Sequence, residues 1–458
     1  MATISVLSFF GIVFGSLAAY LLFHRVNVAI RRHRLARSRG CGKPKRVPQK
    51  DPFLGFDLFR AFEDAASNSK YLEFIANWFS TVGPTFGLNV MGDDMIFTNE
   101  PRNIQAMLAT QFQDFEMDGK DWEHGRALVR PNFVKKQVSN LSIFEKHVSN
   151  LIRQLPADQS KVDIQDWLFR LTLDTGSEYL FGKSASILNS DATETAKTFA
   201  WGFEVGMHTI AKKIRMGRFG WLYREPNYEK ACEICHKYIE PMVQQAVAEA
   251  RSREYSEKSG LIDAEKGGIE NSEERYTFLR TLAKEYKTVT ETDMRNQLLN
   301  ILVAARDTSA CLMASTLFVL AHRHGIQAKV RSELAFLNNR PPTWEELKDL
   351  TYLNNVIREV LRLHPPVPIN VRVAKRDTTL PCGGGPDGTA TVFVEKGKSI
   401  VYSVYSMHRR PDLWGSKAEE FTPERWIGAK PGFEFLPFNA GPRICPGKFH
   451  MKPFIVGI

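Results

Sequence analysis

The chain has 458 residues, of which 43% are hydrophobic and 24% are charged, so it is long enough and apolar enough to bury a large core. Its six cysteines are scattered, which excludes a disulfide scaffold and favours a reducing, cytosol-facing environment. The ten Lys and Arg residues at positions 24–50, where there is no Asp or Glu, account for the whole formal net charge of +10, so a generally basic, nucleic-acid-binding surface is also excluded.

The first predicted element is an N-terminal transmembrane helix. Residues 4–23 carry no formal charge, and a helix of about 20 residues spans a hydrocarbon core of roughly 30 Å. A cleaved signal peptide is the alternative, but it would carry positive charge before a shorter apolar stretch, whereas here the Arg-rich flank follows the apolar stretch. We therefore predict a retained, single-pass anchor at residues 1–23, with the following domain in the cytosol.

A basic, proline-containing hinge is predicted to follow at residues 24–50. Pro44 and Pro48 rule out a continuous helix there and favour an extended connector. No repeat or second boundary stands out after the hinge, so we expect one domain at residues 51–458. The stretch at 251–275 has low hydrophobicity, which indicates a solvated loop or a fraying helix end.

Hydrophobic periodicity predicts a mainly α domain with small β sheets. Apolar residues spaced three and four apart indicate long helices at 162–182, 228–250 and 289–323, and the last of these is apolar enough to run through the core. Short segments that favour β structure, at 85–98 and 390–408, predict a small sheet.

The stretch FNAGPRICPG, residues 438–447, places Cys445 in a turn that suits a metal-binding thiolate. Gly441 and Gly447 allow backbone N–H groups to approach the sulfur, Arg443 supplies a positive charge, and Phe438 can cover the sulfur from one side. The alternative is a buried structural cysteine in a loop that contains glycine and proline.

This stretch resembles the F-x-x-G-x-R-x-C-x-G haem-binding loop of the cytochrome P450 monooxygenases, and every specified position is matched. The resemblance implies the cytochrome P450 fold and a haem b whose iron takes Cys445 as its axial thiolate, with Phe438, Gly441, Arg443 and Gly447 as further cofactor-binding residues. It also implies O2 as co-substrate and an NADPH-dependent flavoprotein reductase as the partner that supplies electrons.

A second match to the family is a predicted clasp of charged side chains. Glu359 and Arg362 match the family's E-x-x-R pair, which is buried and joined to an arginine that corresponds to Arg425 in the segment FTPERW. Without the resemblance, a charged pair three residues apart on a helix would indicate a solvated surface. Together the three residues are expected to form a structural clasp.

Two arginines are expected to hold the haem propionates. Trp122 and Arg126 match the family's W-x-x-x-R motif, whose arginine pairs with a propionate, and Arg372 resembles another propionate partner. A guanidinium suits a carboxylate because it donates two parallel hydrogen bonds. Taken singly, each arginine could instead be exposed to solvent.

The candidate oxygen-activating segment is AARDTS, residues 304–309, inside the long apolar helix. By resemblance to the family's [AG]-G-x-[DE]-T motif, Thr308 would steady dioxygen and Asp307 would help to relay protons to it. A buried Asp-Thr pair is costly unless it is satisfied, and a threonine can simply bond back to its own helix. Ala305 departs from the motif, because it adds a methyl group where the family usually has glycine.

Further segments resemble the fungal cytochromes P450 that hydroxylate n-alkanes and fatty acids, among them GGGPDGTATVFVEKG and YSVYSMHRRPDLWG. This resemblance implies hydroxylation at or near the terminal carbon of a long-chain hydrophobic substrate, drawn from the lipid bilayer of the endoplasmic reticulum. Two alternatives stay open. The chain could oxidise another lipid or a secondary metabolite, or it could be an inactive relative that binds haem weakly or not at all.

The inactive alternative depends on two departures from the family pattern. Only residues 116–121 separate QDF from Trp122, where relatives have a longer loop that roofs the haem. After Gly447 the relatives continue into a further helix and strands, so the C-terminal end is expected to be missing. A gene-model or splicing error and a decaying gene explain both losses equally well.

Residues 232–236, CEICH, match the C-x-x-C-H pattern of covalent haem attachment. The match falls within the helix predicted at 228–250, and Cys445 already accounts for one haem. We therefore expect Cys232 and Cys235 to be two half-buried cysteines of a helix.

Overall fold

The computed structural model describes residues 6–116, 125–126, 128, 141–158, 160–258, 277–338 and 340–449. Contacts divide the chain into two compact units, where the sequence predicts a single domain after the hinge. The first unit comprises residues 1–120, 367–420 and 430–445, and the second comprises residues 121–366, 421–429 and 446–458. The sequence shows no boundary between them because their segments alternate along the chain.

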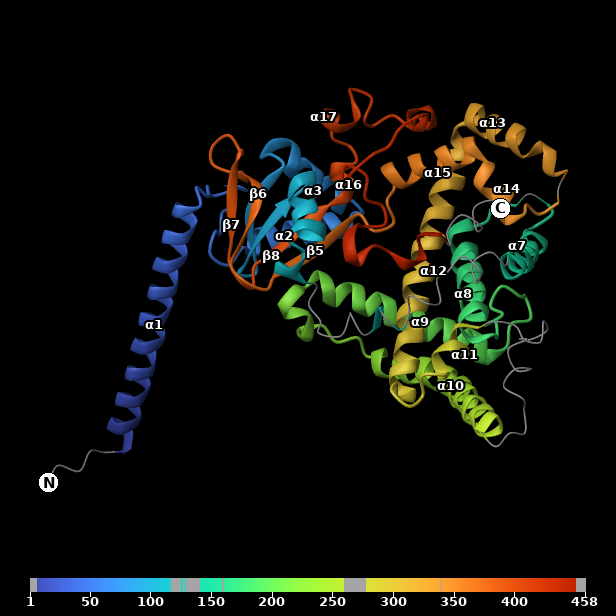
Figure 1. The fold of residues 1–458 in the computed structure, drawn as a ribbon, viewed down its shortest axis with the longest axis horizontal. Helices are drawn as coiled ribbons and strands as arrows, with labels where there is room; N and C mark the ends of the chain where they lie inside the picture. The colour runs from blue at the N-terminus through green and yellow to red at the C-terminus, as the bar shows by residue number, and fades with distance from the viewer. Residues whose placement is uncertain are drawn as a thin grey trace. The chain divides into compact units, whose positions relative to one another are not determined.

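The first unit is built on two β-sheets (Figure 1). A six-stranded mixed sheet has the order β1-β2-β3-β8-β5-β4, and β6 pairs with β7 in a separate antiparallel ribbon. The strands are β1 (Lys45–Arg46), β2 (Thr85–Val90), β3 (Asp93–Thr98), β4 (Phe115–Glu116), β5 (Ile369–Ala374), β6 (Thr378–Gly384), β7 (Ala390–Val394) and β8 (Ser399–Ser403).

The two segments predicted to favour β structure have different outcomes. Residues 85–98 form the antiparallel pair β2–β3, as expected. Residues 390–408 do not form one hairpin, because β7 pairs with β6 whereas β8 pairs with β3 and β5. The end of this segment was wrongly predicted: it is helix α16 (Val404–Met407), which begins where the Ser403 hydroxyl accepts the Ser406 N–H at 3.0 Å.

Short helices surround these strands, and one long helix stands at the N-terminus. The elements are α1 (Val6–Ser38), α2 (Phe56–Ser67), α3 (Tyr71–Thr81), α4 (Pro101–Gln105), the π-helical turn η1 (Ala106–Thr110), the 3-10 turns η2 (Phe112–Asp114) and η7 (Gly441–Arg443), and α17 (Pro411–Trp414). The fully buried Asn103 amide joins three of these strands, because it donates to Thr85, Thr98 and the Cys382 carbonyl.

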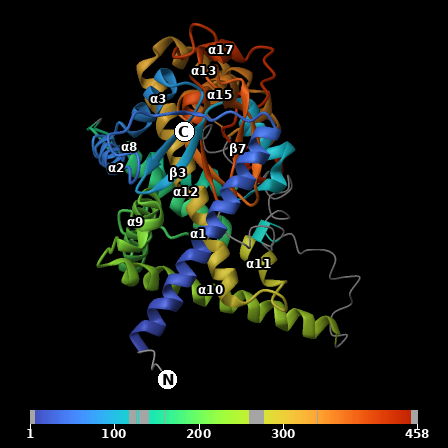
Figure 2. The same ribbon diagram turned by 90° about the vertical axis from the view of Figure 1, so that its left-hand side faces the viewer.

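Helix α1 continues well beyond the predicted anchor, through the first half of the basic hinge, as one uninterrupted rod (Figure 2). Residues 12–38 are long and apolar enough to cross a membrane, and side chains such as Phe14 and Phe23 are each 67% exposed. Near its end, Arg32 forms ion pairs with Asp377 at 3.1 Å and Glu395 at 2.6 Å, which tie α1 to the β6–β7 ribbon. The helix is therefore a candidate membrane anchor whose basic end is held by the first unit.

The second unit is helical in its described part. Its elements are α7 (Ser142–Gln154), α8 (Ile164–Phe181), α9 (Glu194–Arg215), η4 (Gly217–Leu222), α10 (Tyr228–Lys258), α11 (Phe278–Ala283), α12 (Glu291–His322), α13 (His324–Leu334), η5 (Ala335–Leu337), α14 (Trp344–Asp349), α15 (Thr351–Leu363), η6 (Pro423–Trp426) and η8 (Pro446–Phe449). The three long helices expected from periodicity are confirmed as α8, α10 and α12. Residues 251–258 of the expected loop extend α10, and residues 259–276 lie outside the described residues.

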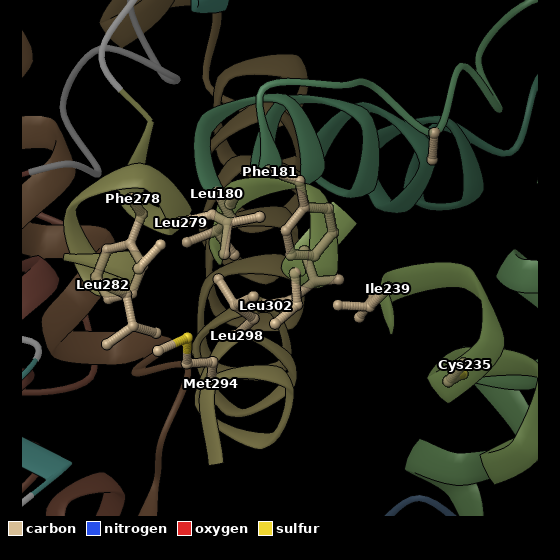
Figure 3. Close-up of a cluster of buried hydrophobic side chains, with 14 of the residues drawn as sticks. Leu180, Phe181, Cys235, Ile239, Phe278, Leu279, Leu282, Met294, Leu298 and Leu302 are labelled. Carbon is tan, nitrogen blue, oxygen red and sulfur yellow. The ribbon is translucent and has the colours of Figure 1, made fainter. Parts of the chain in front are cut away.

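Helix α12 forms the centre of the second unit, where it packs against α8, α10 and α15 (Figure 1). Met294, Leu298 and Leu302 lie one turn apart along it and are fully buried against Leu180, Phe278 and Leu282 (Figure 3). Although α12 is also long and apolar enough to cross a membrane, this packing makes it a core helix.

Polar residues fix the ends of the helices that form this core. The Asp163 carboxylate accepts the N–H groups of Gln165 and Asp166, which starts α8, and Gly182 with φ of 81° ends it. Thr290 caps α12 in the same way by accepting the Asp293 N–H at 3.1 Å. These caps define both ends of α8 and the start of α12.

Candidate functional site

The loop that carries Cys445 is closed by its own backbone. The Cys445 N–H donates to the Phe438 carbonyl at 2.9 Å, and the Ile444 N–H donates to the Gly441 carbonyl at 3.1 Å. Gly441 has φ of 67°, and a Cβ at this position would lie 1.8 Å from the Leu108 carbonyl oxygen. Only glycine fits this close approach, so the expectation that Gly441 provides backbone freedom has a geometric cause. The Cys445 side chain is exposed rather than buried.

A buried tyrosine fixes the same loop from the sheet. Asn439 has φ of 59°, and its side-chain oxygen accepts a hydrogen bond of 2.7 Å from the Tyr402 hydroxyl in β8. Burial raises the pKa of Tyr402 to about 12, although Arg372 acts in the opposite direction. The tyrosine therefore stays a proton donor to Asn439 at neutral pH, and it couples the loop to the six-stranded sheet.

Arg372 in β5 is a buried guanidinium with unused donors. The residue is 1% exposed, and its Nη1 donates to the Val371 carbonyl at 2.7 Å, whereas its Nε and Nη2 have no hydrogen-bond partner among the described residues. Its guanidinium carbon lies 5.5 Å from the centre of the Tyr402 ring, and burial lowers its pKa. Buried donors of this kind are expensive unless an acceptor completes them, and a carboxylate accepts two at once.

These features fit a haem. An exposed cysteine at the end of a fixed loop can supply an axial thiolate, and Arg372 can supply two donors to a propionate. Of the other predicted cofactor residues, Phe438 and Arg443 are half-buried, and Arg443 lies 5.8 Å from the Phe112 ring centre. Gly447 is also half-buried, in the 3-10 turn η8, which begins at Pro446.

Asp307 and Thr308 lie on α12 in the second unit, and both are half-buried, so the predicted buried Asp-Thr pair is wrong in its burial. The Thr308 hydroxyl donates to the Ala304 carbonyl at 2.7 Å, which is the local bond that the sequence leaves open. The pKa of Asp307 is raised, first by burial, with its neighbour Arg306 acting in the opposite direction. The buried members of this segment are Arg306, which is 7% exposed, and Ser309, which is 6% exposed.

Only part of the W-x-x-x-R motif lies among the described residues. Trp122 lies outside the described residues, as does most of the short loop before it. Arg126 is half-buried on a short helical stretch of the second unit. Beside it, Gly125 is buried, and a Cβ there would lie 3.1 Å from the Gln297 side chain of α12, so Arg126 is held close to that helix.

The expected clasp is present in full. Arg362 donates to both oxygens of Glu359, from Nη2 at 2.8 Å and from Nε at 2.9 Å, and both side chains are 0% exposed. Glu359 also accepts the Thr422 N–H at 2.9 Å, Arg425 Nε at 3.3 Å and Trp426 Nε1 at 3.0 Å. The clasp therefore joins α15 to η6, which the chain order places shortly before the Cys445 loop.

The C-x-x-C-H match has the structure of an ordinary helix segment. Cys232 is half-buried on α10, and Cys235 is buried. Burial raises the pKa of Cys235 to about 12, so its reactive thiolate is scarce at neutral pH. In the part of the chain that the structure describes, no group of three or more His, Cys, Asp and Glu side chains could hold a metal ion.

Two features of the site were not anticipated. The Tyr402–Asn439 bond joins residues 37 positions apart, and Arg306 pairs with Glu204, 102 positions away. Neither pair has a sequence spacing that predicts contact. The only available signal was Arg306 itself, a charged residue in the middle of an apolar helix.

Comparison with known proteins gives one family. A family model described as Cytochrome P450 matches residues 57–449. The cytochrome P450 monooxygenase himC of Aspergillus japonicus is 39% identical over 457 residues, which cover 95% of this chain and 80% of that protein. The cytochrome P450 monooxygenase FPY7 of Fusarium mangiferae is 38% identical over 450 residues, covering 93% and 84%. Cytochrome P450 52A12 of Debaryomyces hansenii is 34% identical over 480 residues, covering 96% and 88%.

Replacing Glu359 with glutamine is expected to destabilise the second unit strongly. The change leaves the Arg362 charge buried without its counter-charge, which costs about 3–5 kcal/mol in comparable cases. Thermal unfolding of the purified full chain, followed by circular dichroism, measures the effect. Glu345→Gln, which removes an exposed pair with Lys348 on α14, is the matched control and should change the unfolding temperature little. Equal unfolding temperatures for the two variants would contradict the role of the clasp.

Proposed function

The chain belongs to the cytochrome P450 family of haem-thiolate monooxygenases, and from this premise we propose that Cys445 is the axial thiolate ligand of its haem b. The observation that carries the proposal is the closed loop, in which the 2.9 Å bond between Cys445 and Phe438 and the tight turn at Gly441 leave the sulfur exposed. When bound, the haem supplies the redox chemistry that activates O2 with electrons from NADPH, delivered by a reductase.

Arg372 is proposed to hold a haem propionate. The unpartnered Nε and Nη2 atoms support this role, because a propionate would satisfy both donors in the buried site where water is excluded. Arg126 is proposed as a second propionate partner and Trp122 as its companion, on the strength of the motif. Phe438, Gly441, Arg443 and Gly447 are proposed to shape the loop around the haem.

Asp307 and Thr308 are proposed to deliver protons to dioxygen. Burial raises the pKa of Asp307, although Arg306 acts in the opposite direction, and a raised pKa makes it easier for this carboxyl group to take up a proton. The Thr308 hydroxyl is proposed to donate to oxygen by turning away from the Ala304 carbonyl, to which it now donates. Ala305, which is exposed, would place a methyl group where the family usually has glycine.

The chain is proposed to act at the surface of the endoplasmic reticulum. Residues 1–23 would anchor it by a single pass, the basic residues 24–50, which are helical as far as Ser38, would connect the anchor to the domain, and the domain from residue 51 would lie in the cytosol. The exposed apolar side chains of α1 support this anchoring. The partner is proposed to be an NADPH-dependent flavoprotein reductase that docks on the Cys445 side of the haem.

The proposed substrates are long-chain n-alkanes and fatty acids, hydroxylated at or near the terminal carbon. The support is the resemblance to the fungal group with this activity, and an anchored enzyme can take such substrates directly from the bilayer. Another lipid or a secondary metabolite is the second candidate. The relatives himC and FPY7, whose names state no substrate, are 39% and 38% identical to this chain, whereas P450 52A12 is 34% identical.

Replacing Cys445 with serine is expected to abolish the thiolate-type Soret band in the carbon monoxide difference spectrum of the reduced full-length protein. A hydroxyl does not supply the electron-rich sulfur that produces this band. Cys232→Ser, at a half-buried cysteine of α10, is the control and should keep the band. Retention of the band in Cys445→Ser would refute the assignment of the ligand.

Reconstituted enzyme with reductase and NADPH is expected to convert long-chain fatty acids and n-alkanes to terminal or near-terminal alcohols, detected by mass spectrometry. The Thr308→Ala variant should consume NADPH but release less alcohol per NADPH, because proton delivery is disturbed. Wild-type protein that has the thiolate band but gives no alcohol from either substrate would reject this substrate class in favour of the second candidate.

A further inference from the structure

A buried arginine without an assigned role lies directly before the proposed proton-relay residue. The Arg306 guanidinium carbon lies 4.6 Å from the centre of the Phe169 ring of α8 and 5.4 Å from that of Phe203 in α9. The residue is only 7% exposed. Two aromatic rings therefore hold the guanidinium in place by cation–π attraction and limit where it can point.

Two carboxylates share this guanidinium. Its Nη2 atom donates to Glu204 at 2.7 Å, and its Nη1 atom donates to Asp307 at 3.0 Å. In the described part of the chain, the Arg306 Nε atom has no hydrogen-bond partner. A planar fork can hold two acceptors at fixed positions, which a lysine ammonium cannot do as rigidly. The bridge therefore joins α9 to α12 and fixes the direction of the Asp307 side chain.

The surroundings of Asp307 shift its pKa in opposite directions. Burial raises the pKa of Asp307, Arg306 lowers it, and the Glu204 carboxylate raises it. Among the described residues, these are the charged groups that act on Asp307 from α12 and α9, and α8 contributes the uncharged Phe169. Cys311, one turn further along α12, has a raised pKa, chiefly because of burial and partly because of Asp307.

We propose that Arg306 is a positioning residue that holds Asp307 for proton delivery, and that Glu204 on α9 competes with Asp307 for the same guanidinium. The proposal deepens the proposed function, because it rests on the role of Asp307 as a proton relay. The consequence is that a movement of α9 that draws Glu204 away would leave Arg306 to Asp307 alone. The position of α9 would thus control how readily Asp307 gives up its proton.

Replacing Arg306 and replacing Glu204 are expected to shift the pKa of Asp307 in opposite directions. Arg306→Gln removes the positive charge, so the pKa of Asp307 rises and its carboxyl group stays protonated to higher pH. Glu204→Gln removes the competing negative charge, so the pKa of Asp307 falls and the group ionises at lower pH. Arg306→Lys keeps the charge but loses the fork, and should lie between Arg306→Gln and the wild type.

Infrared difference spectroscopy reads this titration without needing turnover. The carboxyl stretch of Asp307 is identified by subtracting the spectrum of Asp307→Asn from that of the full-length protein, and it is followed against pH in each variant. Arg295→Gln is the matched control, because it removes another ion pair of α12, with Glu240 of α10, and should leave the Asp307 titration unchanged. Unchanged titrations in both Arg306→Gln and Glu204→Gln, or shifts in the same direction, would overturn the proposal.

The pH profile of alcohol released per NADPH then connects the bridge to the reaction. The alkaline limb of the profile, where Asp307 loses the proton that it delivers, should move to higher pH in Arg306→Gln and to lower pH in Glu204→Gln. If the bridge had only a structural role, both variants would loosen the packing of α9 against α12 equally, and neither limb of the pH profile would move. Opposite infrared shifts without any alcohol from the wild type would support the bridge while rejecting the proposed function, so the two failures are distinguishable.

Discussion

The helical second unit depends on the ion pairs and hydrogen bonds that the buried Glu359 carboxylate accepts. This carboxylate is completely buried, and a buried charge is tolerated only when opposite charge and hydrogen bonds compensate its lost hydration. Arg362 supplies the charge from the same helix, and Thr422, Arg425 and Trp426 supply donors from a segment that follows in the chain by about 60 residues. That distant segment is therefore held in one place against α15, and the Cys445 loop follows it in the chain order.

The Cys445 loop follows the same principle on a smaller scale. Its shape is fixed by one backbone bond to Phe438, by the absence of a side chain at Gly441 and by the Tyr402 hydroxyl that holds Asn439. Such a loop has little freedom left to lose when it binds a group, which favours tight and specific ligation. Arg372 differs, because two of its buried donors have no partner among the described residues, and the proposed haem propionate would satisfy both.

The sequence was most informative where the physical signal is local. Apolar periodicity located α8, α10 and α12, because each buries apolar residues spaced three and four apart, and the resemblance of residues 438–447 to a family motif predicted the role of the Cys445 loop. Contacts between residues far apart in the chain could not be predicted from the sequence. Helix α16 begins within a segment that favours β structure, and Arg306 meets Glu204 only because α9 returns to α12. The alternation of the two units along the chain also leaves no mark in composition.

The most direct test of this account is iron K-edge X-ray absorption of the haem-loaded, full-length protein. The account predicts a sulfur atom in the first coordination shell of the iron in the wild type and in Cys232→Ser, and its loss in Cys445→Ser. A first shell that contains only nitrogen and oxygen in the wild type, or sulfur that persists in Cys445→Ser, would contradict it.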